Sequence, residues 1–464
     1  MPTTLEPVRS PAPAADRPAP AGPRAVFAAR RAGAAAEPAW LREAREAGLR
    51  RFEQTGYPTL TDEDWRFTNL APLTQLPFQP APEPAVLTPV EAALERQPFH
   101  GLPGPVLVFV DGYFAPQLST GLQPPGRDGA AVIGNLRAAL AHDPDRLAAL
   151  LTRHAPADDH AFTALNQAFF TDGAYLRVPA GCALEAPVHL VFLGSGRRDA
   201  TASFARNLIH VGAGARLTVI EYSADLADRG SVANHVTELV AEDGAELEHL
   251  KFQDQPAGAF EVSGLYVHLG RRVKFFSHSF ALGARLSRHH IRLGLRGEDT
   301  EAVLNGLYLV NGERLADHHM LVEHASPRCA SHEYFNGILA DRARGVFHGR
   351  ILVRPGAQKT DAKQTNKNLL LSDDAVVDTK PQLEIYADDV KCTHGATVGQ
   401  LHPEHIFYLR ARGIPRETAR QMLIHAFAGE IIDRVQCAAA REALDRLIWD
   451  RLETEERLGL GARD

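Results

Sequence analysis

The chain has 464 residues, of which 45% are hydrophobic, and it carries a formal net charge of −7. This length exceeds that of one ordinary compact core and predicts two or three domains, or one elongated repeat domain with caps. The acidic balance argues against a nucleic-acid binder, which would present a basic face. Because the sequence lacks a run of about 18 apolar residues, we expect neither a membrane-spanning helix nor a membrane partner.

Residues 1–36 are rich in alanine, proline and arginine. Such a segment buries too little apolar area to offset the entropy lost on ordering, so we predict a disordered tail. An organelle transit peptide is the alternative. The segment lacks the serine content of a transit peptide and carries acidic residues, which favours the disordered tail.

Residues 37–170 are predicted to form a mostly helical N-terminal domain. Apolar residues recur near the 3.6-residue period of a helix from Trp40 onward, until a glycine and a proline end the pattern. Further helices are predicted over 133–151 and 161–170, and the apolar run at 106–110 is typical of a strand.

From residue 171 onward the sequence pattern changes to short apolar strands, many of which are preceded by a Gly-Ala or Gly-Arg pair. The pairs at Gly214 and Gly244 introduce the similar segments GARLTVIEY and GAELEHLKF, and the even spacing of the pairs predicts stacked coils of one solenoid. Still shorter strands, separated by turns in Asp, Gly and Pro, are predicted over 369–401. The sequence therefore predicts a mainly β fold with a parallel β-helix core over 171–401.

Residues 402–464 return to the helical period and are predicted to form a C-terminal helical domain. A solenoid exposes unpaired strand edges at its ends, so helical caps are expected there.

A candidate metal-ligand pair lies in KCTHGATVGQL, where Cys392 and His394 are two residues apart. Side chains at i and i+2 of a strand point to the same face, so the thiolate and the imidazole would project together, about 6 to 7 Å apart. Two ligands do not complete a four-coordinate iron or zinc site, so the others would come from elsewhere, such as another subunit. The alternative is a buried thiol and a structural histidine. Lys391 favours the thiolate and Asp388 and Asp389 disfavour it, which leaves the sign of the thiol's pKa shift open.

The four cysteines are Cys182, Cys329, Cys392 and Cys437. They are too scattered to indicate a disulfide framework, so we expect reduced thiols and a cytoplasmic protein.

A second group comprises His318, His319, His324, Cys329 and His332. Its spacing fits no zinc pattern, and the arginine before the cysteine would repel a cation. We expect a structural role and keep the group as a reserve metal site.

The sequence contains no phosphate-binding loop, no dinucleotide-binding glycine motif, no HExxH motif and no serine nucleophile elbow. Any nucleotide hydrolysis is therefore expected from a partner, and the chain is predicted not to be an enzyme.

The motifs RGVFHGRILV, AQKTDA, CTHGAT and FYLRARGI lie between residues 344 and 414, and GYPTLTDEDWRFTNL lies at 56–70. Together these motifs resemble the SufD family, a scaffold subunit of the Suf iron–sulfur cluster assembly machinery. The resemblance thus spans nearly the whole chain beyond the tail. The sister subunit SufB shares the fold but typically has His-Glu-Ala where this chain has His394-Gly395-Ala396.

The resemblance implies a right-handed parallel β-helix between helical domains. It also implies pairing with SufB through the β-helix and with the ATPase SufC through the C-terminal helical domain. The family's functional cysteine and histidine fall on Cys392 and His394, at the interface where a nascent iron–sulfur cluster forms. Family members commonly have Pro-His-Cys where this chain has Pro327-Arg328-Cys329, which weakens a ligand role for that stretch. Stoichiometry, cluster type, flavin binding and a homodimer in place of the heterodimer stay open.

We therefore predict a scaffold subunit for iron–sulfur cluster assembly that acts with SufB and SufC and holds a transient cluster at a shared interface. The alternative is a free-standing β-helix enzyme that acts on carbohydrates. Neither a repeated groove of acidic and basic residues nor a row of aromatic residues supports this alternative, and only 7% of the residues are aromatic.

Overall fold

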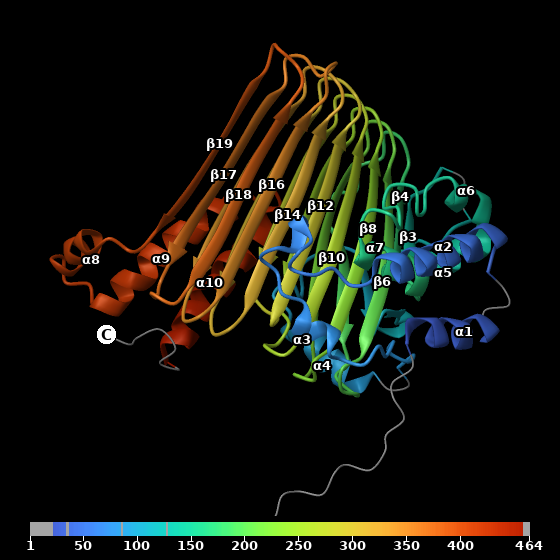
Figure 1. Cartoon of the computed structure of the whole chain (residues 1–464), viewed down its shortest axis with the longest axis horizontal. Coiled ribbons are helices and arrows are strands. Elements are labelled where there is room, and N and C mark those ends of the chain that lie inside the picture. Colours follow the sequence, from blue (N-terminus) through green and yellow to red (C-terminus); the bar gives the residue numbers. More distant parts are fainter. Residues whose placement is uncertain (1–21, 34–36, 85–86, 127–128, 458–464) are drawn as a thin grey trace, which may run out of the picture.

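One long solenoid of parallel strands dominates the computed structural model, which describes residues 22–33, 37–84, 87–126 and 129–457 (Figure 1). From β6 to β17, successive strands alternate between two sheets, so each of them pairs with the strand two places before it and the strand two places after it. The sheets have ten strands, ordered β19-β17-β15-β13-β11-β9-β7-β5-β1-β2, and nine strands, ordered β18-β16-β14-β12-β10-β8-β6-β4-β3. This parallel β-solenoid of about eight turns confirms the predicted β-helix core.

Most strands of the solenoid are eight to ten residues long. Their bounds are β4 Ala174–Val178, β5 Val188–Gly194, β6 Ala202–Val211, β7 Arg216–Asp225, β8 Val232–Ala241, β9 Glu246–Gln253, β10 Phe260–Leu269, β11 Lys274–Ala281, β12 Leu286–Leu295, β13 Glu301–Val310, β14 Leu315–His324, β15 Ala330–Leu339, β16 Arg344–Val353, β17 Asp361–Leu370, β18 Val376–Ile385 and β19 Lys391–Gly399.

The parallel pairs are in register, so each residue lies beside the residue one turn earlier and faces the same way. Leu293 of β12, Val322 of β14 and Ile351 of β16 are one such column, and all three are buried inside the solenoid. Burying an aliphatic side chain of this size contributes about 1.5 to 3 kcal/mol. Stacked columns of this kind form the core.

The prediction of very short strands over 369–401 was wrong, because β17, β18 and β19 each run for nine or ten residues. Residues 378–381, which the sequence predicts to be a turn, lie inside β18. Their extended backbone is fixed by the ladder with β16. Pro381, which has no backbone N–H to donate, is tolerated because β18 is the last strand of its sheet.

The N-terminal region contains short helices and three strands. Their bounds are α1 Pro23–Gly33, α2 Ala39–Thr55, the 3-10 turn η1 Glu63–Trp65, α3 Ala71–Thr74, α4 Thr88–Arg96, β1 Val106–Val110, β2 Tyr113–Phe114, the 3-10 turn η2 Pro116–Leu118, β3 Val132–Asn135, α5 Leu136–His142, α6 Pro144–Ala148 and α7 Ala161–Phe169. The strand expected at 106–110 is present as β1, which pairs in parallel with β5. The helix expected from residue 133 begins at Leu136 instead, because β3 pairs with β4.

Helix α1 lies within the segment that we predicted to be disordered. Residues 1–21 and 34–36 lie outside the described residues, but the prediction is wrong for Pro23–Gly33. The Phe27 ring packs edge-on against Phe169 with 5.9 Å between centroids, and the Arg30 guanidinium donates to the carbonyl oxygens of Phe169 and Phe170. These partners lie far away in sequence, so the composition of the segment could not reveal them.

A buried ion pair joins the N-terminal region to the solenoid. Arg206 of β6 and Glu238 of β8 are 2.8 Å apart, and both side chains are fully buried. The Glu238 carboxylate also accepts hydrogen bonds from the backbone N–H groups of Thr152, His154 and Ala155. This one carboxylate therefore holds both a strand neighbour and the loop that leads into α7.

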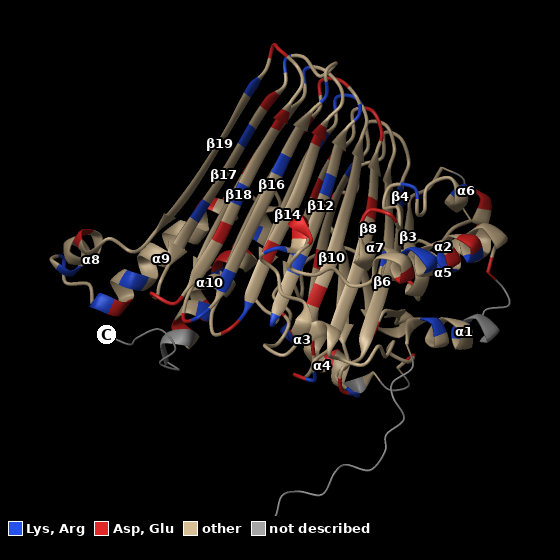
Figure 2. Ribbon diagram, viewed as in Figure 1, with Lys and Arg blue, Asp and Glu red and all other residues tan. Residues whose placement is uncertain are grey.

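The C-terminal helices are α8 Pro403–Arg410, α9 Arg416–Ile432 and α10 Ala438–Arg457. Helix α9 packs against β13 and β15, where Ile424, Ala428 and Ile431 join a buried cluster with Leu307 and Ile338. In the described residues, no helix is long and apolar enough to cross a membrane. Lysine and arginine residues are interspersed with aspartate and glutamate residues along the strands and helices (Figure 2).

We expect Glu238→Gln to lower the free energy of unfolding by about 3 to 5 kcal/mol, because the substitution leaves the Arg206 charge buried without a carboxylate. Glu246→Gln is the control, since it breaks the half-exposed pair with Lys274 and should cost less than about 1 kcal/mol. Urea unfolding followed by circular dichroism measures both. Equal losses for the two variants would contradict the anchoring role of Glu238.

Candidate functional site

Cys392 and His394 lie on β19, the last strand of the ten-strand sheet. One edge of β19 pairs with β17, and no strand in the described part of the chain pairs with the other edge. Cys392 is half-buried, and every other residue of β19 is exposed. The pair therefore lies at the open end of the solenoid.

Both side chains face the side of β19 that continues the solenoid interior. In the parallel register Cys392 lies beside Ala362, and His394 lies beside Gln364. Ala362 is buried in an apolar cluster with Ile351, and Cys392 packs against this cluster. The thiol and the imidazole thus share one face, as the i and i+2 spacing predicts.

A polar column runs inward from His394. Gln364 is buried and its amide donates to the Glu333 carboxyl over 2.6 Å. Full burial raises the pKa of Glu333 to about 8, so this carboxyl holds a proton at neutral pH. Gly349 on the opposite sheet makes room, because a Cβ there would meet the Gln364 amide at 2.1 Å. The sequence analysis missed Glu333 and Gln364, although Glu333, Gln364 and His394 follow one another in the sequence at intervals of one solenoid turn.

The Cys392 thiol is protonated at neutral pH. Burial raises its pKa, the Asp361 carboxylate on β17 raises it further, and the backbone N–H of Ala362 opposes the shift. The sequence had suggested Lys391 and the acidic residues at 388 and 389 as the opposing influences, but the neighbouring strand supplies the charge. Metal binding to this sulfur must therefore displace a proton.

The other three cysteines lie in apolar surroundings. The Cys329 thiol is buried and donates to the Gly297 carbonyl over 3.2 Å, and burial raises its pKa. Cys182 and Cys437 are half-buried against apolar clusters. All four thiols are unpaired, and Cys392 alone lies on an exposed edge strand.

The second histidine and cysteine group, between residues 318 and 332, does not bring its side chains together around one possible metal position. His318 and His324 face inward and bond to Ser279 and Ser331 at 2.9 and 2.8 Å. His332 lies 3.7 Å from Asp361 on a neighbouring strand. His319 faces outward and meets two residues that the sequence analysis did not single out, Asp64 and His348.

Two family models match this chain. The description "SUF system FeS cluster assembly, SufBD core domain" matches residues 192–427, and "SufBD protein N-terminal region" matches residues 28–190. The chain belongs to the SufBD family. Iron–sulfur cluster assembly is therefore its role, and this relationship decides against the carbohydrate-active alternative.

The SufBD relatives match most of the chain. The iron–sulfur cluster assembly protein SufD of Escherichia coli is 33% identical over 87% of this chain and 91% of its own length. A SufBD family protein of Synechocystis is 32% identical over 84% and 86%. SufD of Bacillus subtilis is 27% identical over 63% and 67%.

We expect Asp361→Asn to speed the alkylation of Cys392 by iodoacetamide at pH 8. Removing the neighbouring carboxylate lowers the thiol's pKa and so increases the thiolate fraction, which is the reactive form. Mass spectrometry of the Cys392 peptide measures the rate. Asp388→Asn is the matched control and should leave the rate unchanged. An equal rate for Asp361→Asn and the unsubstituted chain would contradict the assigned cause of the shift.

Proposed function

We propose that this SufBD chain is a non-catalytic scaffold subunit that pairs with SufB and supplies Cys392 and His394 as ligands to a nascent iron–sulfur cluster. The observation that carries the proposal is the position of the two side chains on one face of an edge strand at the open end of the solenoid. Two ligands hold a cluster only when a second chain provides the others. The cluster is the cargo of the complex, and the protein holds it transiently.

The open end of the solenoid has the features of a docking surface for another β-solenoid. The free edge of β19 presents unpaired backbone groups, which an added strand can satisfy. Large apolar side chains are exposed close to this end, namely Val376, Ile385, Tyr386 and Val398. These features support SufB as the occupant of this surface.

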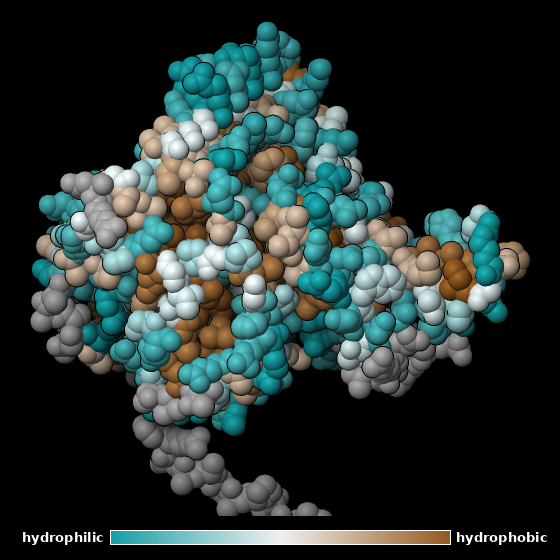
Figure 3. Space-filling model, turned by 180° about the vertical axis from the view of Figure 1, so that it is seen from behind, coloured by the Kyte–Doolittle hydropathy of each residue, from teal (hydrophilic) through white to brown (hydrophobic). Residues whose placement is uncertain are grey.

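Helix α8 supports a second contact, with the ATPase SufC. The Phe407 and Tyr408 side chains are 73% and 59% exposed, and no residue of α8 is buried. Figure 3 shows apolar side chains on the lobe that projects at the right, where α8 lies when the molecule is seen from behind. Helix α9, by contrast, uses its apolar residues to cover the solenoid.

In this proposal SufC binds and hydrolyses ATP, and the scaffold pair supplies the cluster ligands. ATP binding by SufC shifts the arrangement of the scaffold pair, so that the ligands at the interface become accessible. This chain contributes no hydrolysis of its own. Its four unpaired thiols support the cytoplasmic setting that the sequence predicts.

We expect His394→Ala to leave the complex with SufB and SufC assembled but to abolish cluster formation in cells, because one ligand is removed from a large interface. Complementation of a strain that lacks this gene, together with copurification of the partners, measures both effects. Thr393→Ala is the matched control, because Thr393 lies on the opposite face of the same strand and should complement fully. Full growth with His394→Ala would return His394 to a structural role.

We expect Phe407→Asp to weaken copurification with SufC while SufB binding and the circular dichroism spectrum stay unchanged, since a charge replaces an exposed apolar side chain. Glu404→Gln on the same helix is the control. Point variants are preferable to truncation before α8, because truncation also removes the residues of α9 that cover the solenoid. Undiminished SufC binding by Phe407→Asp would place the contact elsewhere.

A further inference from the structure

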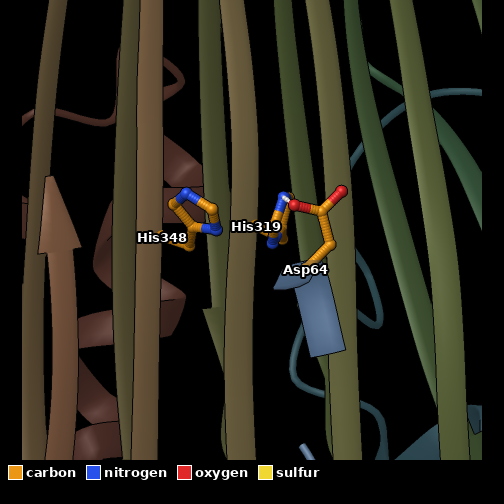
Figure 4. A group of neighbouring side chains, drawn as sticks. All are labelled: Asp64, His319 and His348. Carbon is orange, nitrogen blue, oxygen red and sulfur yellow. Dashed lines mark ion pairs between the residues drawn. The ribbon is translucent and has the colours of Figure 1, made fainter. Parts of the chain in front are cut away.

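A group of two histidines and one carboxylate lies on the outer face of the nine-strand sheet, away from β19. His319 of β14 and His348 of β16 are neighbours in the parallel register, and the Asp64 carboxylate of η1 lies next to His319 (Figure 4). One ligand atom from each of the three residues lies within 4.8 Å of the other two, and the His319 Nε2 and Asp64 Oδ1 atoms are 3.6 Å apart. Ligand atoms around a tetrahedral metal, bound at about 2.1 Å, are roughly 3.4 Å apart, so only a small closure is needed.

The segment that carries Asp64 is held on the sheet by contacts on both sides of it. Lys380 of β18 donates to Glu63 over 2.7 Å, and Thr68 donates to Asp317 of β14 over 2.6 Å. The Arg288 guanidinium lies 3.8 Å from the centre of the Trp65 ring. These contacts fix Asp64 next to His319 without using any of the three ligand atoms.

The charges around the group are balanced, with one exception. Lys380 pairs with Glu63, Arg288 pairs with Asp317, and Arg350 pairs with Glu384 at 3.0 Å. Among the described residues, the Asp64 carboxylate has no lysine or arginine partner, and its ion-pair partner is His319. His319 and His348 are both buried against the sheet. A cation placed between the three residues would meet the Asp64 carboxylate and one ring nitrogen from each histidine.

A second group of one carboxylate and two histidines lies nearby, and its ligand atoms already have hydrogen-bond partners within the protein. Asp159, His160 and His290 also lie within reach of one ion. The Nδ1 atom of His160, however, accepts from the first backbone N–H groups of α7, and Asp159 is bonded by Arg292, His290 and the Tyr266 hydroxyl. These ligand atoms are occupied by the protein. In the Asp64 group only His348 has a further side-chain hydrogen bond among the described residues, from Nε2 to Gln382 over 3.4 Å.

We propose that Asp64, His319 and His348 form a binding site for one divalent first-row transition-metal ion, distinct from the Cys392 and His394 site. Two imidazoles and one carboxylate are the ligand set that zinc and ferrous iron take in proteins. The Asp64 side chain is 53% exposed, so the ion has a route in and solvent can complete its coordination. The inference does not rest on the proposed scaffold function.

The test is a titration of the purified, chelator-stripped full-length chain with Co²⁺ under anaerobic conditions, followed by visible absorbance and by melting temperature. We use the Cys392→Ser, His394→Ala background so that the other ligand pair cannot contribute. One equivalent of Co²⁺ should bind and raise the melting temperature. Asp64→Asn and His348→Gln should each weaken binding at least tenfold, since even the loss of an outer partner of a metal ligand costs 10- to 100-fold.

Glu242→Gln is the matched control, because His210 and Glu242 form a similar pair at 3.0 Å that has no third ligand in the described part of the chain. It should bind Co²⁺ as tightly as the background chain. Asp64 is exposed, so Asp64→Asn folds even if His348→Gln does not, and circular dichroism checks each variant. Competition with Zn²⁺ and Fe²⁺ then identifies the preferred ion. The proposal is overturned if the background chain binds no stoichiometric Co²⁺, Zn²⁺ or Fe²⁺, or if Asp64→Asn binds as tightly as the control.

Discussion

The in-register stacking of each strand on the strand one turn earlier is the constraint on which the rest of this structure depends. Parallel ladders fix which side chains face inward, so a residue's environment is set by the residues about 29 to 31 positions away from it along the chain. Apolar columns built in this way form the core. The same rule lines up polar columns, such as Glu333, Gln364 and His394, and the outer column of His290, His319 and His348.

The ladder ends at β19, and the proposed ligand pair of this SufBD protein lies on that last strand. Cys392 is half-buried by the turn beneath it, while His394 lies exposed because no turn covers it. Burial and a neighbouring carboxylate keep the thiol protonated in the isolated chain. A partner that covers the edge and brings further ligands would change both conditions together, which is what the proposed shared site requires.

The interactions that hold the N-terminal region on the solenoid differ in how much they contribute to the free energy of folding. Separating the fully buried Arg206 and Glu238 side chains costs much free energy, whereas the exposed pair of Lys380 with Glu63 contributes little. The buried pair therefore fixes where the region sits. Weaker contacts around Glu63 and Thr68 then settle the position of Asp64 over the sheet.

The sequence by itself determined the features that depend on local period and spacing. It predicted the solenoid, the helices on either side of it and the common face of Cys392 and His394, because alternation and helical period are properties of neighbouring residues. Only the tertiary structure decided that α1 is ordered and that β18 runs through a segment predicted to be a turn. It also showed that Asp361 is the charged residue beside Cys392. It also brought Asp64 to His319 and His348. The partners in each of these cases lie on other elements, and folding alone makes them neighbours.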